Sequence, residues 1–149
     1  MDAWRLCSPR FRASAMSGEG ARLSPGRWNA RGTRMVYCGT TLSLAVLEMQ
    51  VQAGDMLPIY DAFKLHVPDG FVTRVEVGQL RDGWRDDVEA TRQIGESWVE
   101  QQTSVGLLVP SSVVPQEMNL LLNPLHPDFG RVSWGAPSRF QIDPRLFKE

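Results

Sequence analysis

Short apolar runs, separated by glycine, proline and polar residues, divide the chain into strand and helix candidates. Runs that are apolar or alternate between apolar and polar positions predict strands. These runs lie at Trp4–Ser8, Met35–Cys38, Ile59–Val67, Phe71–Val77, Val105–Val109, Met118–Leu122 and Arg139–Ile142. Residues 9–34 contain several glycines and prolines, so we expect an irregular loop there.

Two segments have the spacing of helices. The first follows Thr40 or Thr41, either of which can cap its N-terminus. It is apolar almost all round, so we expect most of this helix to be buried. The second, from about 86 to 102, is polar apart from Ile94 and Trp98, whose spacing of four places them on one inward face. Strands and helices in this order are typical of an α+β fold.

Length and composition restrict the class of protein. The chain has 149 residues, of which 42% are hydrophobic, so we expect a single domain over residues 1–149 with a substantial core. No apolar run is long enough for a membrane helix, and the first residues lack the apolar stretch of a signal peptide. Cys7 and Cys38 alone form neither a disulfide framework nor a four-ligand metal site. The sequence therefore predicts a cytoplasmic protein that does not bind a metal or a membrane.

The small net charge hides an uneven distribution along the chain. The formal net charge is -1, and 14 of the 16 basic residues are arginine. A general nucleic-acid-binding protein usually has a basic excess, so we expect no direct binding of nucleic acid. Residues 1–40 have a net charge of +5, and residues 41–149 a net charge of -6. Codon usage in a GC-rich genome can account for many arginines, but it accounts less well for their clustering. We therefore expect a localised basic cleft on an acidic body.

The loop of residues 21–32 is the first candidate for chemistry. It carries Arg22, Arg27 and Arg31 among glycines that allow a close approach of the backbone to a ligand. Guanidinium groups beside backbone N–H groups suit a diphosphate. The alternative is a surface loop with solvated arginines and a buried Trp28.

Three further residues each have a functional and a structural interpretation. The Tyr37 ring could stack on a flat heterocycle, or its hydroxyl could simply be hydrogen-bonded in the core. Glu48 lies in the apolar helix, where a carboxylate either occupies the one wet stripe or stabilises an oxocarbenium-like state. Ser111 follows a strand, where serine is usually a turn residue. Only His66 and His126 could serve as bases, and no Gly-x-Ser-x-Gly motif is present, so a serine-hydrolase triad has weak support.

A series of short motifs extends over nearly the whole chain. In order they are Trp4-Arg5, Gly26-Arg27-Trp28-Asn29, Val36-Tyr37, Ser43-Leu44-Ala45-Val46-Leu47-Glu48, Val109-Pro110-Ser111, Pro115-Gln116-Glu117-Met118-Asn119, Leu122-Asn123-Pro124-Leu125-His126-Pro127 and Asp143-Pro144-Arg145-Leu146. Each motif is weak by itself, but together they resemble the RES domain, a family of bacterial toxins named for an arginine, a glutamate and a serine. Residues 55–104 resemble the family only loosely.

This resemblance implies the fold of ADP-ribosyltransferase toxins, in which a split β-sheet with flanking helices surrounds a NAD cleft. It implies an enzyme that uses NAD as a substrate and releases nicotinamide. The ADP-ribose acceptor stays open between water, phosphate and a protein; one related branch modifies the enzyme that makes phosphoribosyl pyrophosphate. The resemblance also implies a hetero-oligomer with an Xre-type antitoxin that occludes the cleft.

The resemblance also assigns individual residues. Arg27, Glu48 and Ser111 match the arginine, glutamate and serine of the family, and Tyr37 matches its cleft tyrosine. Asn119 matches a recurring asparagine, whose alternative role is to pair buried backbone. The first four of these are the candidate catalytic residues, which we also expect to bind NAD, and the further candidates for NAD binding are Trp28, Arg22, Arg31 and Asn119. One departure from the family is Ser24-Pro25-Gly26, which replaces a more usual glycine pair before Arg27.

Two other classes of function remain open at this point. The first is a ribonuclease-type toxin that uses His66 or His126 as a base and arginines to bind the RNA phosphates. The second is a non-catalytic interaction module, for which Glu48 would have no chemical role.

Overall fold

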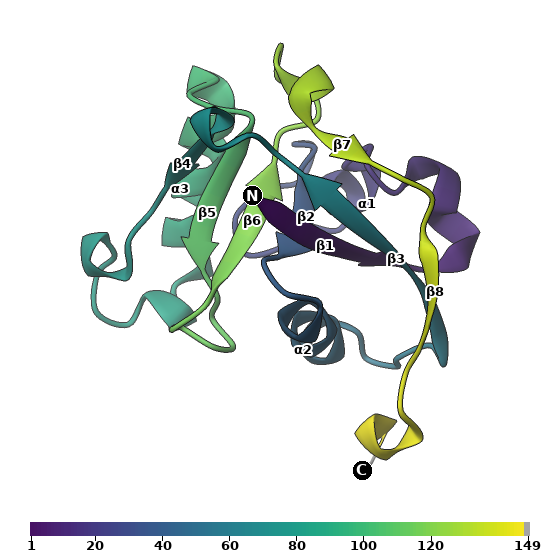
Figure 1. Ribbon diagram of the computed structural model, residues 1–149. Helices are drawn as coiled ribbons and strands as arrows, with labels where there is room; N and C mark the ends of the chain where they lie inside the picture. Colours follow the sequence, from purple (N-terminus) through teal and green to yellow (C-terminus); the bar gives the residue numbers. More distant parts are fainter. Residues whose placement is uncertain (148–149) are drawn as a thin grey trace.

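A mixed β-sheet organises the computed structural model, which describes residues 1–147 (Figure 1). In this part of the chain eight strands form the sheet: β1 (Asp2–Cys7), β2 (Val36–Gly39), β3 (Ile59–His66), β4 (Val72–Arg74), β5 (Gly106–Pro110), β6 (Met118–Leu122), β7 (Ser133–Trp134) and β8 (Ser138–Gln141). Their order is β4-β5-β6-β2-β1-β3-β7, and β8 also pairs with β3. Only β4 and β5 pair in parallel among these strands. The expected α+β fold is confirmed.

The sheet divides in two where β1 meets β2. β1 pairs with β3 from Asp2 to Cys7, but it shares only the register pair of Trp4 and Gly39 with β2 within the described residues. Strands β1 and β3 run across the direction of β5 and β6 (Figure 1). The result is the split sheet that the resemblance implied, with a seam between β1 and β2.

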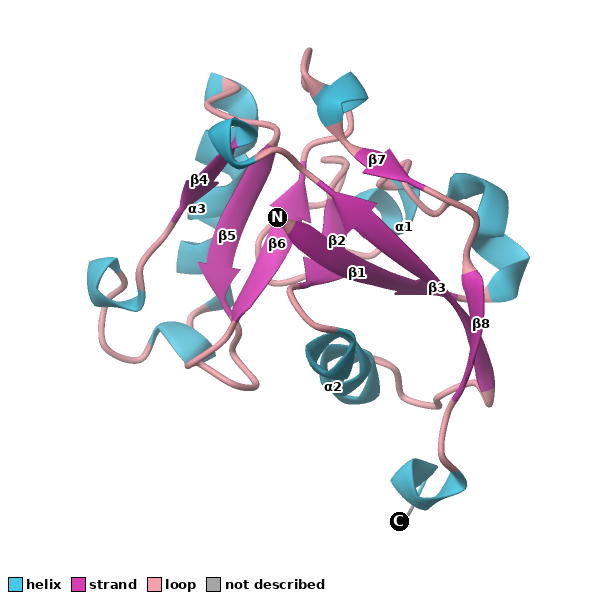
Figure 2. Ribbon diagram, viewed as in Figure 1, coloured by secondary structure: helices cyan, strands magenta, loops and turns pink. Residues whose placement is uncertain are grey.

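The helices lie on different parts of this sheet. In the described chain they are α1 (Glu19–Leu23), α2 (Leu42–Gln52) and α3 (Val88–Gln101). Figure 2 shows α2 beside the lower ends of β1 and β2, and α3 on the side of β4 and β5. The Thr41 hydroxyl accepts a hydrogen bond from the Leu44 N–H (3.1 Å), and the Asp87 carboxylate accepts one from the Ala90 N–H (3.1 Å). These N-caps explain where α2 and α3 begin. No helix among residues 1–147 has the length and apolar character that a membrane crossing requires.

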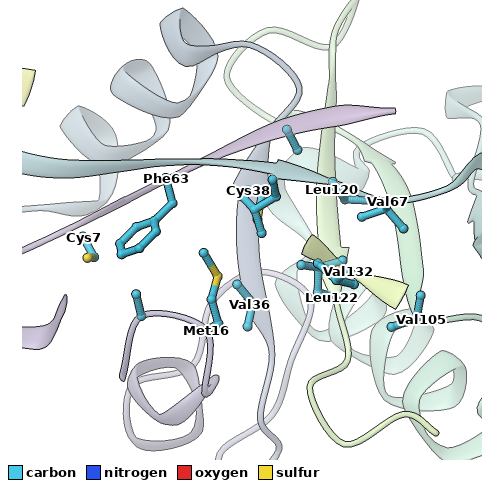
Figure 3. Packing of buried hydrophobic residues seen from close by; sticks show 13 residues of the cluster. Cys7, Met16, Val36, Cys38, Phe63, Val67, Val105, Leu120, Leu122 and Val132 are labelled. Atoms are coloured by element: carbon cyan, nitrogen blue, oxygen red, sulfur yellow. The ribbon is translucent and has the colours of Figure 1, made fainter. Parts of the chain in front are cut away.

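Each face of the sheet has its own core because neighbouring residues of a strand point to opposite faces. Leu120 and Leu122 of β6 join a cluster with Val36 and Cys38 of β2 (Figure 3). Leu121, between them, joins a second cluster on the other face, whose further members include Trp28, Trp84, Trp98, Met35 and Val109. This tryptophan cluster attaches α3 and the loop around Trp28 to β5 and β6, so it positions the loop that carries Arg27.

Three expectations about local structure were wrong. Residues 9–34 are not a continuous irregular loop, because they contain a 3₁₀ turn at Pro9–Ser14 as well as α1. The expected strand 71–77 is shorter, since β4 covers only Val72–Arg74 and 3₁₀ turns flank it on both sides. Helix α2 is not mostly buried: Leu47 is 38% and Val51 66% exposed. The sheet covers only one side of this helix, so its apolar residues do not all find a partner.

Candidate active site

A cleft of about 510 Å³ opens beside the seam of the sheet. Its walls come from distant parts of the chain: Arg5 of β1, Tyr37 of β2, Glu48 of α2, Arg27 of the loop before β2 and Arg92 of α3. A side pocket of about 70 Å³ continues the cleft past Arg5, Tyr37 and Glu48. The volume of the main cleft is typical of binding sites for small molecules.

Glu48 is the carboxylate of the cleft, and two side chains hold it in place. Its Oε1 accepts a hydrogen bond from the Ser111 hydroxyl (2.7 Å) and another from the Asn119 amide Nδ2 (2.8 Å). Ser111 directly follows β5 and Asn119 belongs to β6, so adjacent strand ends deliver both donors. Both bonds go to one oxygen, and within residues 1–147 no side chain or backbone group donates to Oε2. The arrangement can therefore present a fixed negative charge to a ligand in the cleft.

Ser111 is fully buried, and its hydroxyl is completely engaged. The oxygen accepts hydrogen bonds from the backbone N–H groups of Val113 (3.1 Å) and Val114 (3.0 Å), while the proton goes to Glu48. The two backbone bonds are typical of a serine in a turn. Ser111 therefore forms a turn, as is usual for a serine after a strand, and it also orients Glu48.

Asn119 orients Glu48 at the expense of its own amide oxygen. Its Nδ2 faces the carboxylate, and its buried Oδ1 has no hydrogen-bond partner within the described chain. A buried acceptor without a partner destabilises a fold by about 1–3 kcal/mol. Such an unsatisfied group requires an explanation, and the fixed position of Glu48 supplies one.

Tyr37 joins the cleft to the loop that carries Arg27. Its hydroxyl donates to Asn29 Oδ1 (2.6 Å) and accepts from the Trp28 N–H (3.0 Å), and burial raises the pKa of this hydroxyl. Gly26 lies against the end of the ring, because a Cβ at this position would be 2.7 Å from Tyr37 Cζ. The hydroxyl is thus a structural group, while the side chain also lines the cleft.

Arg27 is half-buried and faces the cleft without a carboxylate partner within 4 Å in the described chain. Its Nη1 donates to the carbonyl of Trp84 (3.4 Å), and its Cζ lies 5.9 Å from the centre of the Trp84 indole ring. Burial lowers the pKa of Arg27, and the charge of Glu48 acts in the opposite direction. Because no carboxylate of the described chain pairs with it, the Arg27 guanidinium is available to bind an anionic ligand.

Helix α3 fixes the loop around Arg27. The Thr91 hydroxyl donates to the Arg27 carbonyl (2.7 Å), and the Glu96 carboxylate accepts from the Ala30 N–H (3.1 Å). Gly95 lies between these residues, where a Cβ would be 1.7 Å from the Trp28 carbonyl oxygen. The loop therefore owes its position to a helix that follows it by more than 50 residues in the sequence.

The other candidates lie outside the cleft. Arg22 binds Glu19 (2.8 Å), and Arg31 donates to the Leu23 carbonyl (2.8 Å). Neither arginine lines the cleft. Trp28 is 2% exposed and belongs to the tryptophan cluster, so its side chain supports the loop from below.

Arg5 and Arg92 also line the cleft, although neither was among the residues expected there. Arg5 carried a signal, because it is a charged residue in a predicted strand and belongs to the Trp4-Arg5 motif. Arg92 carried none, because its helix is rich in polar residues.

Neither histidine lines the cleft, so the structure does not support their use as bases there. His126 is buried, with its Nε2 3.0 Å from the Gln102 carbonyl oxygen, and His66 pairs with Asp2. Within residues 1–147 no group of His, Cys, Asp or Glu side chains is arranged to hold a metal ion.

Known proteins with similar sequences are named as toxins. A family model described as the RES domain matches residues 2–143. A protein of Yersinia enterocolitica named Toxin Res is 37% identical, over 98% of this chain and 99% of that protein. A protein of Sphingobium named Prs ADP-ribosylating toxin is 33% identical, over 98% of this chain and 96% of that protein.

A solved structure has the same fold. A chain of the crystal structure of the M. tuberculosis MbcT–MbcA toxin–antitoxin complex superimposes with a TM-score of 0.77, over 97% of this chain and 85% of that one. The two sequences are 20% identical, so this similarity concerns the fold. The split sheet is thus an arrangement that a solved structure also adopts.

Proposed function

The chain belongs to the RES domain family, and on this premise we propose that it is the toxin of a toxin–antitoxin system. As an enzyme, we propose, this toxin cleaves the nicotinamide–ribose bond of NAD. The observation that carries the proposal is the fixed carboxylate of Glu48 in a cleft with an excess of arginine. Of the residues that the structure describes, Arg5, Arg27, Arg92 and Glu48 are the charged side chains of this cleft. Three guanidinium groups and one carboxylate leave two positive charges, which match the two negative charges of a diphosphate.

The proposed reaction begins when NAD binds with its diphosphate beside the arginines and its nicotinamide ribose beside Glu48. The bond between the nicotinamide nitrogen and ribose C1′ breaks, and its electron pair leaves with neutral nicotinamide. Positive charge then develops over C1′ and the ring oxygen. Glu48 stabilises this charge, and Ser111 and Asn119 keep its carboxylate from turning away. An oxygen or nitrogen of the acceptor finally bonds to C1′ and loses its proton to water.

Three acceptors are compatible with this chemistry. Transfer to water or to phosphate would deplete NAD, whereas transfer to a protein would modify a target. The name of the Sphingobium relative favours a protein, and phosphoribosyl pyrophosphate synthetase is the target to test first. The partner that we propose is an Xre-type antitoxin that covers the cleft in a hetero-oligomer; the complex in which the solved neighbour was found supports this proposal.

The central experiment replaces Glu48 by glutamine. Glu48→Gln keeps an oxygen for Ser111 and Asn119 but removes the charge, so folding and NAD binding should be retained. Nicotinamide release should fall by about 100-fold or more. Glu89→Gln, on the exposed side of α3, is the matched control and should release nicotinamide at the wild-type rate. Undiminished release by Glu48→Gln would overturn the proposal.

A second assay identifies the acceptor. The purified protein is mixed with NAD labelled in its adenosine half and with a cell lysate, with or without added phosphate. Label on a discrete protein band supports transfer to a protein, and purified phosphoribosyl pyrophosphate synthetase then tests the named target. Label only in small products supports hydrolysis or phosphorolysis, and dependence on added phosphate distinguishes the two.

A further inference from the structure

Arg92 presents unused hydrogen-bond donors to the cleft. Its Nε donates to the Gly26 carbonyl (2.9 Å) and its Nη2 to the Pro25 carbonyl (3.4 Å). These bonds use two of the five N–H donors of a guanidinium group, so three remain. No carboxylate of residues 1–147 forms an ion pair with Arg92, although its side chain lines the cleft. The two backbone carbonyls therefore orient the guanidinium without neutralising it.

The guanidinium groups of Arg27, in the loop, and Arg92, on α3, have different surroundings. That of Arg27 turns toward Trp84 and also lines a second hollow, of about 540 Å³, together with Arg85. That of Arg92 donates to the carbonyls of Pro25 and Gly26 and does not line the second hollow. The cleft is thus lined by two guanidinium groups with different hydrogen-bond partners, and neither forms an ion pair within the described chain.

Tyr37 connects Arg92 with Glu48. Tyr37 and Glu48 both line the side pocket, which neither Arg27 nor Arg92 reaches. The hydroxyl end of Tyr37 contacts Gly26, whose carbonyl accepts the hydrogen bond of Arg92. Arg92 therefore binds the loop beside the hydroxyl end of Tyr37, whereas Glu48 lines the side pocket that Arg92 does not reach. Gly20, Ala21 and Ser24 also line the cleft.

We propose that Arg92 binds the adenosine-side phosphate of the substrate and so makes the cleft specific for a dinucleotide. This inference rests on the proposed function, because it requires the nicotinamide ribose to lie beside Glu48. The nicotinamide-side phosphate is then the nearer one and belongs to Arg27. The second phosphate, which nicotinamide mononucleotide lacks, binds to the free N–H donors of Arg92.

The test compares the binding of two probes, ADP-ribose and nicotinamide mononucleotide, by titration calorimetry at constant salt. Arg92→Ala should bind ADP-ribose about tenfold more weakly than the wild-type chain, which is the usual effect of losing a charge-assisted hydrogen bond. Its affinity for nicotinamide mononucleotide should stay within about twofold of the wild type. Arg27→Ala, in contrast, should weaken the binding of both probes.

Two control variants separate phosphate binding from other effects. Thr91→Val removes the bond to the Arg27 carbonyl without changing the charge of the cleft, so it reports on loosening of the loop. Arg139→Ala removes an exposed arginine of β8, outside the cleft, and should leave the binding of both probes unchanged. Because a looser loop displaces Arg27, Thr91→Val should affect both probes alike.

Each remaining outcome has a defined consequence. Equal losses for both probes in Arg92→Ala would reduce Arg92 to a support of the loop and overturn the inference. Wild-type affinity of Arg92→Ala for ADP-ribose would overturn it as well. A wild-type chain that binds neither probe would overturn the proposed function itself.

Discussion

Arg5 donates a hydrogen bond of 3.2 Å to the carbonyl oxygen of Tyr37 and so connects β1 with β2 beside their one register pair. The same guanidinium donates to the Ala15 carbonyl (3.0 Å). A side chain thus replaces backbone bonds that two fully paired strands would form. The seam that it crosses is the place where the cleft opens, and Arg5 lines the cleft as well. Arg5 therefore has a structural role and contributes positive charge to the site.

We expect Arg5→Met to destabilise the protein by about 1–3 kcal/mol, because partly buried carbonyls of Tyr37 and Ala15 would lose their donor. Methionine retains much of the length and apolar surface of the side chain, so the loss reports mainly on hydrogen bonding. Urea denaturation followed by tryptophan fluorescence measures the free energy of unfolding. Arg10→Met, at an exposed position, is the control. Equal stability of the two variants would show that Arg5 does not hold the seam.

Ser111→Ala tests whether Ser111 positions Glu48 or attacks the substrate. The variant loses a donor to Glu48 and an acceptor for two backbone N–H groups, so we expect a loss of about 1–3 kcal/mol in stability. Nicotinamide release should fall but stay above that of Glu48→Gln, because Asn119 still orients the carboxylate. Release and unfolding are measured on the same preparations, with Ser133→Ala, at an exposed position of β7 outside the cleft, as the control. Complete loss of release in a folded Ser111→Ala would favour a nucleophilic serine.

The sequence was most informative where a polar residue interrupts an apolar element. Glu48 stands in an apolar helix and Ser111 just after a buried strand, and the structure joins the two by a hydrogen bond. It was least informative about arginines, because arginines that are close together in the sequence need not lie close together in the fold. Arg22 lies in the arginine-rich segment but is occupied by Glu19, three residues earlier in the same short helix. Arg92 lies in the acidic part of the chain and still reaches the cleft, since α3 folds back over the loop.

The burial of α2 could not be predicted for a related reason. Apolar residues surround this helix, yet Leu47 and Val51 are exposed because the sheet approaches it from one side. A periodic pattern indicates which side chains are able to be buried. It does not indicate how many neighbouring elements are present to cover them.

Stability should fall as the pH rises above about 9. Burial raises the pKa of the Cys38 thiol to about 12, and it also raises the pKa of Cys7. The folded chain therefore keeps these protons in a range where the unfolded chain releases them, so their contribution is complete below about 9 and is lost at higher pH. Urea denaturation at pH 8, 9 and 10 and constant ionic strength measures this slope. Cys38→Ala should have a shallower slope; an unchanged slope would contradict the assignment.

Gly95→Ala should reverse the usual effect of this substitution. In the interior of a helix, alanine is normally more favourable than glycine by about 1 kcal/mol. At position 95, however, the new Cβ would be 1.7 Å from the Trp28 carbonyl oxygen, so α3 and the loop must separate. We expect a loss of at least about 2 kcal/mol in the free energy of unfolding. We also expect weaker binding of ADP-ribose, since Thr91 and Glu96 hold the Arg27 loop from the same helix.

Gly20→Ala in α1, where no atom lies within 4 Å of the new Cβ, is the matched control for stability. If Gly95→Ala is as stable as Gly20→Ala, the close contact between α3 and the loop does not exist in solution.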